Sequence, residues 1–232
     1  MSGLSVVHDR LTKIYERMGI VKPIGTGWIA DNLYAVKTGP VNFFIFKKGT
    51  DCIALDSGMD MLIVNRELAE LGISPASVCA VFLSHTDFDH VGGLQAFPDA
   101  TIYLSHYEEQ LIVNKTARKA RCIFNKHINR PYSLLKDGEI ITIGGIKVEA
   151  LETPGHTIGS MSYIVDNDIL FVGDTFTYRD GHAQPVARFL NMDNKELERT
   201  LRRLGMLESI QLALTSHRGF TSEFRNTMER WH

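Results

Sequence analysis

The stretch Ser84-His85-Thr86-Asp87-Phe88-Asp89-His90, followed by Gly92-Gly93, decides the fold of this chain. It places two imidazoles and two carboxylates within six positions, directly after the apolar run 78–83, which fits a buried strand. Ligands at this spacing, on a loop between a strand and a helix expected from about Gly92, can diverge toward two adjacent cations. The alternative is a polar, solvated loop, which predicts nothing about the rest of the chain.

Three further candidate ligands stand at the ends of expected strands. His156 lies in a Pro-Gly turn after residues 146–151, Asp174 comes two positions after the segment 169–172, and His217 follows the apolar strand 211–215. Strand ends at one edge of a sandwich converge in space, while the loops that follow them present side chains to a site. The pattern therefore favours a metal site over a solvated loop.

The order of expected elements indicates an α/β (α+β) protein with two packed sheets. Strands are expected at 25–29, 33–37, 41–46, 52–55, 78–83, 101–104, 139–143, 146–151, 162–165, 169–172 and 211–215, and helices at 4–19, 61–71, from about 92, from 106, and at 194–207. The last helix opens with Asp193 and Glu196 at capping-box spacing. Two strand-rich halves, each followed by helices, predict a four-layer αββα sandwich.

Composition narrows the class of protein. A chain of 232 residues that is 44% hydrophobic is expected to form a single domain over 1–232. With 25 basic and 27 acidic residues, no overall charge favours nucleic acid or a membrane surface. Three cysteines without CxxC spacing argue against a disulfide framework or a thiolate zinc site. The chain shows neither a signal peptide nor a long apolar run, so a cytoplasmic location is expected.

The pattern His85-x-Asp87-x-Asp89-His90, followed by His156, Asp174 and His217, resembles the ligand signature of the metallo-β-lactamase superfamily over nearly the whole chain. The element Asp56-Ser57-Gly58 after an early strand also matches that family. The resemblance implies the αββα fold and two metal ions. It assigns His85, Asp87 and His156 to the first metal, Asp89, His90 and His217 to the second, Asp174 as the bridge, and Asp56 as a support of the metal loop.

Asp87 departs from the family pattern, which has histidine there. Two divalent cations contribute +4 and the three aspartates −3, so the site carries +1, whereas a histidine at this position would leave +2. Harder oxygen ligands favour iron or manganese over zinc, which is the metal preference we expect. A carboxylate at this position, glutamate rather than aspartate, is found in the iron-binding flavodiiron branch of the superfamily.

The resemblance implies hydrolysis. Two adjacent divalent metals can share a bridging hydroxide as the nucleophile, with Asp89 as a catalytic residue that orients it or receives a proton. The substrate would be a small ester, thioester, lactone or phosphodiester. The first alternative is a di-iron redox or sensor protein that binds O2 or NO, and the second is a catalytically silent binding module. No nucleic-acid or membrane partner is indicated, and the oligomeric state stays open.

Polar residues near the ligands are candidates for substrate binding. Tyr178, Arg179, His182 and Arg188 follow Asp174 closely, and Arg218 follows His217. The basic segment 115–130 contains Lys115, Arg118, Lys119, Arg121, Lys126 and Arg130. This segment is either a lid that attracts an anionic substrate or a solvated face.

Overall fold

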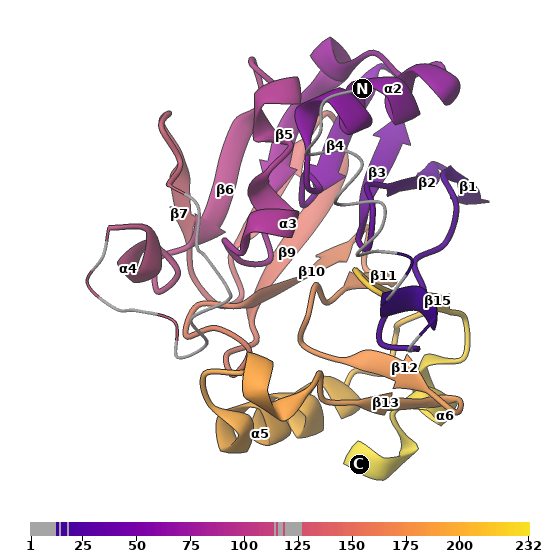
Figure 1. The fold of residues 1–232 in the computed structure, drawn as a ribbon, viewed down its shortest axis with the longest axis vertical. Coiled ribbons are helices and arrows are strands. Elements are labelled where there is room, and N and C mark those ends of the chain that lie inside the picture. The colour runs from indigo at the N-terminus through magenta and orange to yellow at the C-terminus, as the bar shows by residue number, and fades with distance from the viewer. Residues whose placement is uncertain (1–12, 14, 18, 114, 116–117, 119–126) are drawn as a thin grey trace.

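A computed structural model describes residues 13, 15–17, 19–113, 115, 118 and 127–232 of the chain (Figure 1). Most of the expected N-terminal helix at 4–19 lies outside the described residues, as do Lys119, Arg121, Cys122 and Lys126. Among the described residues, none of the helices combines the length and the apolar character needed to span a bilayer.

The first sheet has seven strands in the order β1-β2-β3-β4-β5-β6-β7. They are β1 (Gly27–Ala30), β2 (Leu33–Lys37), β3 (Asn42–Lys48), β4 (Asp51–Leu55), β5 (Val78–Phe82), β6 (Thr101–Ser105) and β7 (Ser133–Leu135). The first four form an antiparallel meander, whereas β4 to β7 are parallel neighbours. Parallel pairing requires crossover connections, and these carry α2 (Met61–Glu70), α3 (Phe88–Val91) and α4 (Glu109–Ile112).

The second sheet has six strands in the order β15-β14-β11-β10-β9-β8. They are β8 (Ile140–Ile143), β9 (Ile146–Glu152), β10 (Met161–Val165), β11 (Ile169–Phe171), β14 (Leu212–Thr215) and β15 (Gly219–Thr221). Strand β14 runs parallel to β11, and α5 (Asn194–Gly205) lies in the connection between them. A separate hairpin pairs β12 (Thr177–Arg179) with β13 (His182–Gln184), and α6 (Phe224–Thr227) lies near the C-terminus.

The core lies between the two sheets, and helices cover both outer faces. Phe44 of β3 contacts Phe171 of β11 with ring centroids 5.6 Å apart, within a hydrophobic cluster that contains residues of both sheets. Helix α2 packs Val64 and Leu68 on the outer face of the first sheet, whereas α5 packs Leu201 on that of the second. Figure 1 shows these two helices at opposite ends of the view. The αββα sandwich is therefore confirmed.

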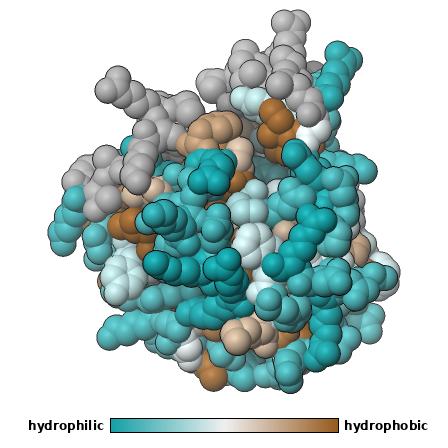
Figure 2. All heavy atoms as spheres, turned by 90° about the horizontal axis from the view of Figure 1, so that it is seen from below, coloured by the Kyte–Doolittle hydropathy of each residue, from teal (hydrophilic) through white to brown (hydrophobic). Residues whose placement is uncertain are grey.

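The surface around α5 is polar. Arg199 on this helix has a side chain that is 71% exposed and pairs with Glu196. The face seen from below in Figure 2 is mostly hydrophilic, with apolar side chains only in small separate groups. The apolar residues of α5 therefore face the protein interior, as the leucine spacing predicted.

Several elements differ from the sequence expectations. Helix α3 begins at Phe88, not near Gly92, because Asp87 is already the extended residue before it. Gly92 instead allows close packing, since a Cβ there would lie 1.9 Å from Met59 O. The helix expected from His106 shrinks to the four residues of α4. The expectations omitted β7, β12, β13, β15, α6 and the short turns η1 (Pro75–Ser77), η2 (Leu94–Ala96), η3 (Arg188–Leu190) and η4 (Glu229–Trp231).

The N-terminus of α5 agrees with the expected cap only in part. Asp193 Oδ1 accepts hydrogen bonds from the backbone N–H groups of Lys195 and Glu196, at 2.9 and 3.0 Å. The Glu196 carboxylate pairs with Arg199, and the backbone N–H of Asp193 donates to Gly155 O. Asp193 is thus a one-sided cap, and its backbone ties the helix to the turn that carries His156.

Candidate metal centre

The seven candidate ligands come from four strand ends. The segment after β5 carries His85, Asp87, Asp89 and His90, and the turns after β9, β11 and β14 carry His156, Asp174 and His217 respectively. A Cβ on Gly173, which has φ +54°, would lie 2.4 Å from Ser84 Oγ. Glycine at this position therefore allows the loops of the two sheets to meet.

The first group consists of His85, Asp87 and His156, all buried. Asp87 Oδ2 lies 3.5 Å from His85 Nε2 and 3.3 Å from His156 Nε2. Burial raises the pKa of Asp87, but the charge of His85 and a hydrogen bond from His156 outweigh it and hold the pKa well below its usual range. Asp87 is therefore an anion, as a carboxylate ligand must be.

The second group consists of Asp89, His90 and His217. His217 Nε2 lies 3.4 Å from Asp89 Oδ2, and His90 Nε2 lies 3.7 Å from Asp89 Oδ1. The Asp89 and His217 side chains are 26% and 18% exposed, so this group faces the more open side of the centre.

Asp174 lies between the two groups. Its Oδ2 is 3.3 Å from His217 Nε2, 3.7 Å from His90 Nε2 and 3.8 Å from His156 Nε2. Burial raises the pKa of Asp174, but His217 and His90 outweigh it and hold the pKa well below its usual range.

Buried atoms in the centre fit divalent cations. Among the described residues, His85 Nε2, His90 Nε2 and Asp174 Oδ1 are buried without a hydrogen-bond partner. Buried polar atoms are normally paired, and imidazole nitrogens and carboxylate oxygens without a partner are the donors that such a cation coordinates. The residues present therefore fit a metal pair.

Neighbouring acceptors orient the imidazoles. The Nδ1 atoms of His90 and His217 donate to Asp56 Oδ2 at 2.7 Å and to Pro40 O at 2.8 Å. His156 Nδ1 lies 3.1 Å from Asn191 Oδ1. Because Nδ1 carries the proton in these rings, the lone pair of Nε2 is directed into the centre.

The two histidines beside Asp174 predict how metal removal changes stability with pH. Burial lowers the pKa of His217, but Asp174 and Asp89 raise it from 6.5 to about 9, and the pKa of His90 also rises well above its ordinary value. Protonated His217 therefore stabilises chelator-treated protein fully below pH 6.5, and this contribution is lost as the pH rises through about 9.

We expect the Tm of chelator-treated protein to fall from pH 6.5 to about 9, measured by thermal scanning, and to fall less in His217→Gln. Added divalent metal displaces the Nε2 proton, so its affinity should rise over the same range. A wild-type Tm that rises with pH in chelator would contradict the charged His217–Asp174 pair.

Glu108 is a positioning residue that the sequence reasoning missed. Its fully buried carboxylate accepts from Thr86 N and Thr86 Oγ1 through Oε1, both at 2.8 Å, and from Thr157 Oγ1 through Oε2 at 2.6 Å. Thr86 lies between His85 and Asp87, and Thr157 follows His156, so one carboxylate links both loops of the first group. No local pattern marks a single glutamate in an irregular segment as such a link.

Replacing Glu108 by alanine is expected to lower both stability and metal content. The change removes the charged acceptor of three buried hydrogen bonds, each worth roughly 1.5–3 kcal/mol. Glu108→Gln should behave like the wild type, because the amide oxygen can accept from Thr86 and the amide N–H can donate to Thr157 Oγ1. Thermal unfolding and elemental analysis check this, and equal behaviour of the two variants would contradict the link.

The candidate substrate-binding residues lie in different environments. Tyr178 donates from its hydroxyl to Ala213 O at 2.8 Å and packs against the outer cluster of the second sheet. Arg218 donates to the carbonyls of Gly19 and Ile20. Arg179 is exposed and His182 half-buried. Their role toward a substrate stays a prediction.

Of the basic residues in segment 115–130, the structure describes Lys115, Arg118 and Arg130, and these three lie in different environments. Lys115 is exposed, whereas Arg130 donates to the carbonyls of Phe97 and Ala100. Arg118 has a side chain that is only 3% exposed and contacts Asp87. Arg118 therefore belongs to the centre and not to a solvated face.

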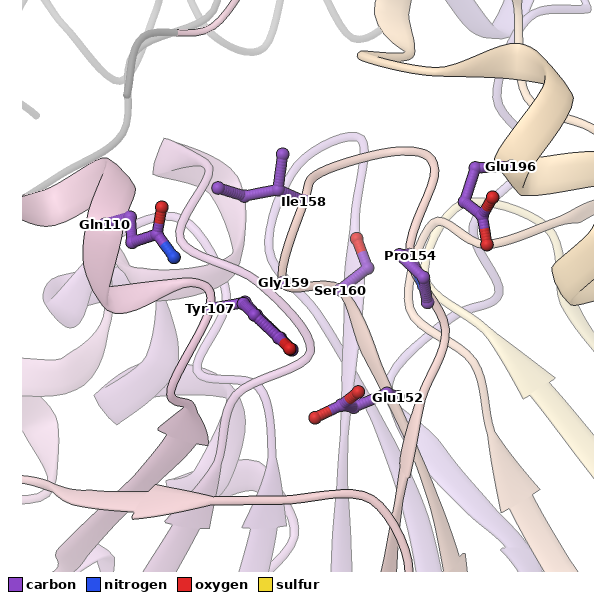
Figure 3. Close-up of a pocket in the computed structure, with 8 residues that line it drawn as sticks. All are labelled: Tyr107, Gln110, Glu152, Pro154, Ile158, Gly159, Ser160 and Glu196. Atoms are coloured by element: carbon purple, nitrogen blue, oxygen red, sulfur yellow. The ribbon is translucent and has the colours of Figure 1, made fainter. Parts of the chain in front are cut away.

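A cavity of about 590 Å³ is bordered by residues on either side of His156 in the sequence. Its lining comprises Tyr107, Gln110, Glu152, Pro154, Ile158, Gly159, Ser160 and Glu196 (Figure 3). None of the seven candidate ligands lines it, so this cavity is separate from the centre.

Comparisons with known proteins show that this chain is similar to probable metallo-hydrolases. A family model described as the metallo-beta-lactamase superfamily matches residues 36–209. The probable metallo-hydrolase YqgX of Bacillus subtilis is 29% identical over 59% of this chain and 67% of its own length. A probable metallo-hydrolase of Methanocaldococcus jannaschii is 29% identical over 68% of this chain and 65% of its own length. The chain therefore spans about two thirds of the length of these relatives.

A solved structure shares the fold over most of the chain. A B3 metallo-beta-lactamase, described as the first with an active site glutamic acid, superposes with a TM-score of 0.70 at 20% identity. The superposition covers 94% of this chain and 91% of that one. At this identity the likeness concerns the fold alone.

Proposed function

Because this chain belongs to the metallo-beta-lactamase superfamily, we propose that it is a metal-dependent hydrolase that uses two divalent cations. The observation that carries the proposal is the convergence of two ligand groups on Asp174, whose Oδ2 lies within 3.8 Å of imidazole nitrogens from both. The substrate class we propose is a small ester, thioester, lactone or phosphodiester.

When bound, two divalent cations would supply a nucleophilic hydroxide near neutral pH and polarise the scissile carbonyl or phosphoryl oxygen. The chain supplies positioning and proton transfer around them. Asp56 and Pro40 O hold the rings of His90 and His217 in the ligating tautomer. Asp89, on the more open side, is the group we assign to receive a proton from the nucleophile or to orient it.

The metals we propose are iron or manganese. Asp87, Asp89 and Asp174 give the centre three carboxylates. Hard oxygen ligands shift the metal preference from zinc toward iron or manganese. Elemental analysis of protein made with balanced metals tests this preference. Full occupancy by zinc alone, with full activity, would overturn it.

The deciding experiment combines metal content and turnover in one anaerobic preparation from medium with iron, manganese and zinc. We expect about two metals per chain and hydrolysis of at least one substrate among an aryl ester, an acyl thioester, a lactone and bis(p-nitrophenyl) phosphate. Chelator should abolish the activity, and added metal should restore it. Tight metal binding without hydrolysis across the panel would count against the hydrolase.

The second candidate function is a di-iron protein that binds O2 or NO. The carboxylate of Asp87 within the first group favours it, because oxygen-rich ligand sets suit iron. Spectra of the iron-loaded preparation separate the two functions. Reversible changes on adding O2 or NO, in the absence of hydrolysis, would support the sensor or redox function.

A further inference from the structure

Arg118 places a permanent positive charge inside the first ligand group. Its Nη2 donates to Asp87 Oδ2 at 2.8 Å and lies 3.3 Å from His156 Nε2. These are the atoms that this group offers to a cation. A guanidinium stays protonated in proteins, so its charge cannot be relieved by deprotonation.

The guanidinium is held firmly in this position. Nη1 donates to His156 O, and Nη2 also reaches Leu190 O at 3.0 Å. The side chain is 3% exposed, and it connects the loop of Asp87, the turn of His156 and the end of η3. Arg118 is therefore built into the protein and is not available as a surface charge for an anionic substrate.

A metal ion in the first group needs the same electron pairs that Arg118 already uses. It would bond to Asp87 Oδ2 and to the lone pair of His156 Nε2, and it would be repelled by the neighbouring guanidinium. Among the described residues, the ion pairs of Asp89 in the second group and of the central Asp174 are with histidines, and neither carboxylate pairs with an arginine or a lysine.

We propose that Arg118 competes with the metal for Asp87 and His156, so that the two ligand groups fill in sequence: the Asp89–His90–His217 group first and the His85–Asp87–His156 group second. This inference rests on the proposed function only in that the groups bind metal. The side chain at position 87 explains why an arginine lies here. A carboxylate attracts a guanidinium, whereas the histidine expected from the family pattern is neutral and would not.

The test is a Mn²⁺ titration of chelator-treated protein by calorimetry, with circular dichroism to check folding. Wild type should bind one Mn²⁺ tightly and a second at least about tenfold more weakly. Arg118→Met keeps the length of the side chain without its charge and should tighten the weak site about tenfold or more. The matched control is Arg130→Met, because that guanidinium also bonds backbone carbonyls but touches none of the ligands.

A double-mutant cycle supplies a second measurement should the methionine variant unfold. In the Asp87→His background the guanidinium loses its anionic partner, so Arg118→Gln should change the weaker affinity far less than it does with Asp87 present. Equal effects in both backgrounds would overturn the competition. So would a wild type with two equally tight sites that Arg118→Met leaves unchanged, although the hydrolase proposal would survive. A wild type that binds no divalent metal would overturn both.

Discussion

Asp174→Ala is expected to lower kcat/KM by roughly 10³-fold or more, because the variant loses the carboxylate between the two ligand groups. Asp174 Oδ2 lies 3.3 Å from His217 Nε2 and 3.8 Å from His156 Nε2, so one side chain serves both groups. Without Asp174, the centre also loses a negative charge that would balance the charge of a bound metal ion. Metal content should therefore fall together with turnover.

The measurement is steady-state kinetics on the best substrate of the panel, with elemental analysis of the same preparation. Asp31→Ala is the matched control, because Asp31 is an exposed aspartate away from the four strand ends. An Asp174→Ala variant that holds two metals and turns over at the wild-type rate would refute the central role of Asp174.

Asp56→Asn is expected to weaken metal binding about 10- to 100-fold while the fold persists. Asp56 accepts from Ser84 N through Oδ1 and from Ser84 Oγ and His90 Nδ1 through Oδ2. An amide has one oxygen, so it must present N–H either to His90 Nδ1 or to the backbone N–H of Ser84. In the first case His90 takes the tautomer that cannot ligate through Nε2.

The backbone itself should tolerate this change. Asp56 has φ +63°, a region that asparagine adopts readily. Asp60→Asn is the control, because Asp60 only caps α2 through Leu62 N and Ile63 N, a role that asparagine fills equally well. Metal titration of both variants checks the prediction. Equal affinities would mean that Asp56 supports the loop but does not set the His90 tautomer.

The sequence alone could predict the layers of the fold, because amphipathic patterns are local. The run 33–37 forms β2 with the expected bounds. The regularly spaced leucines of α5 pack in the outer cluster of the second sheet, as expected. The start of α3 was predicted wrongly. Gly92 and Gly93 do not begin a helix but follow α3, and they are small because the backbones of Met59 and Ser57 pass close by.

The candidate ligands could also be found in the sequence, since each follows an apolar strand and carries a side chain that metals prefer. Their neighbours could not. Glu108 and Arg118 lie in irregular segments, and Asn191 and Pro40 reach the centre from elements far away in the chain. Pro40 contributes a backbone carbonyl, which no residue type reveals.

The sequence by itself thus determined which chemical groups stand at the strand ends and in what order, because residue type and strand periodicity are properties of short segments. Only the tertiary structure decided what surrounds those groups: the Pro40 carbonyl on His217, the Glu108 link between two loops, and the Arg118 guanidinium between Asp87 and His156. These contacts join segments from different layers. The packing of one sheet on the other sets them, and no local pattern encodes that packing.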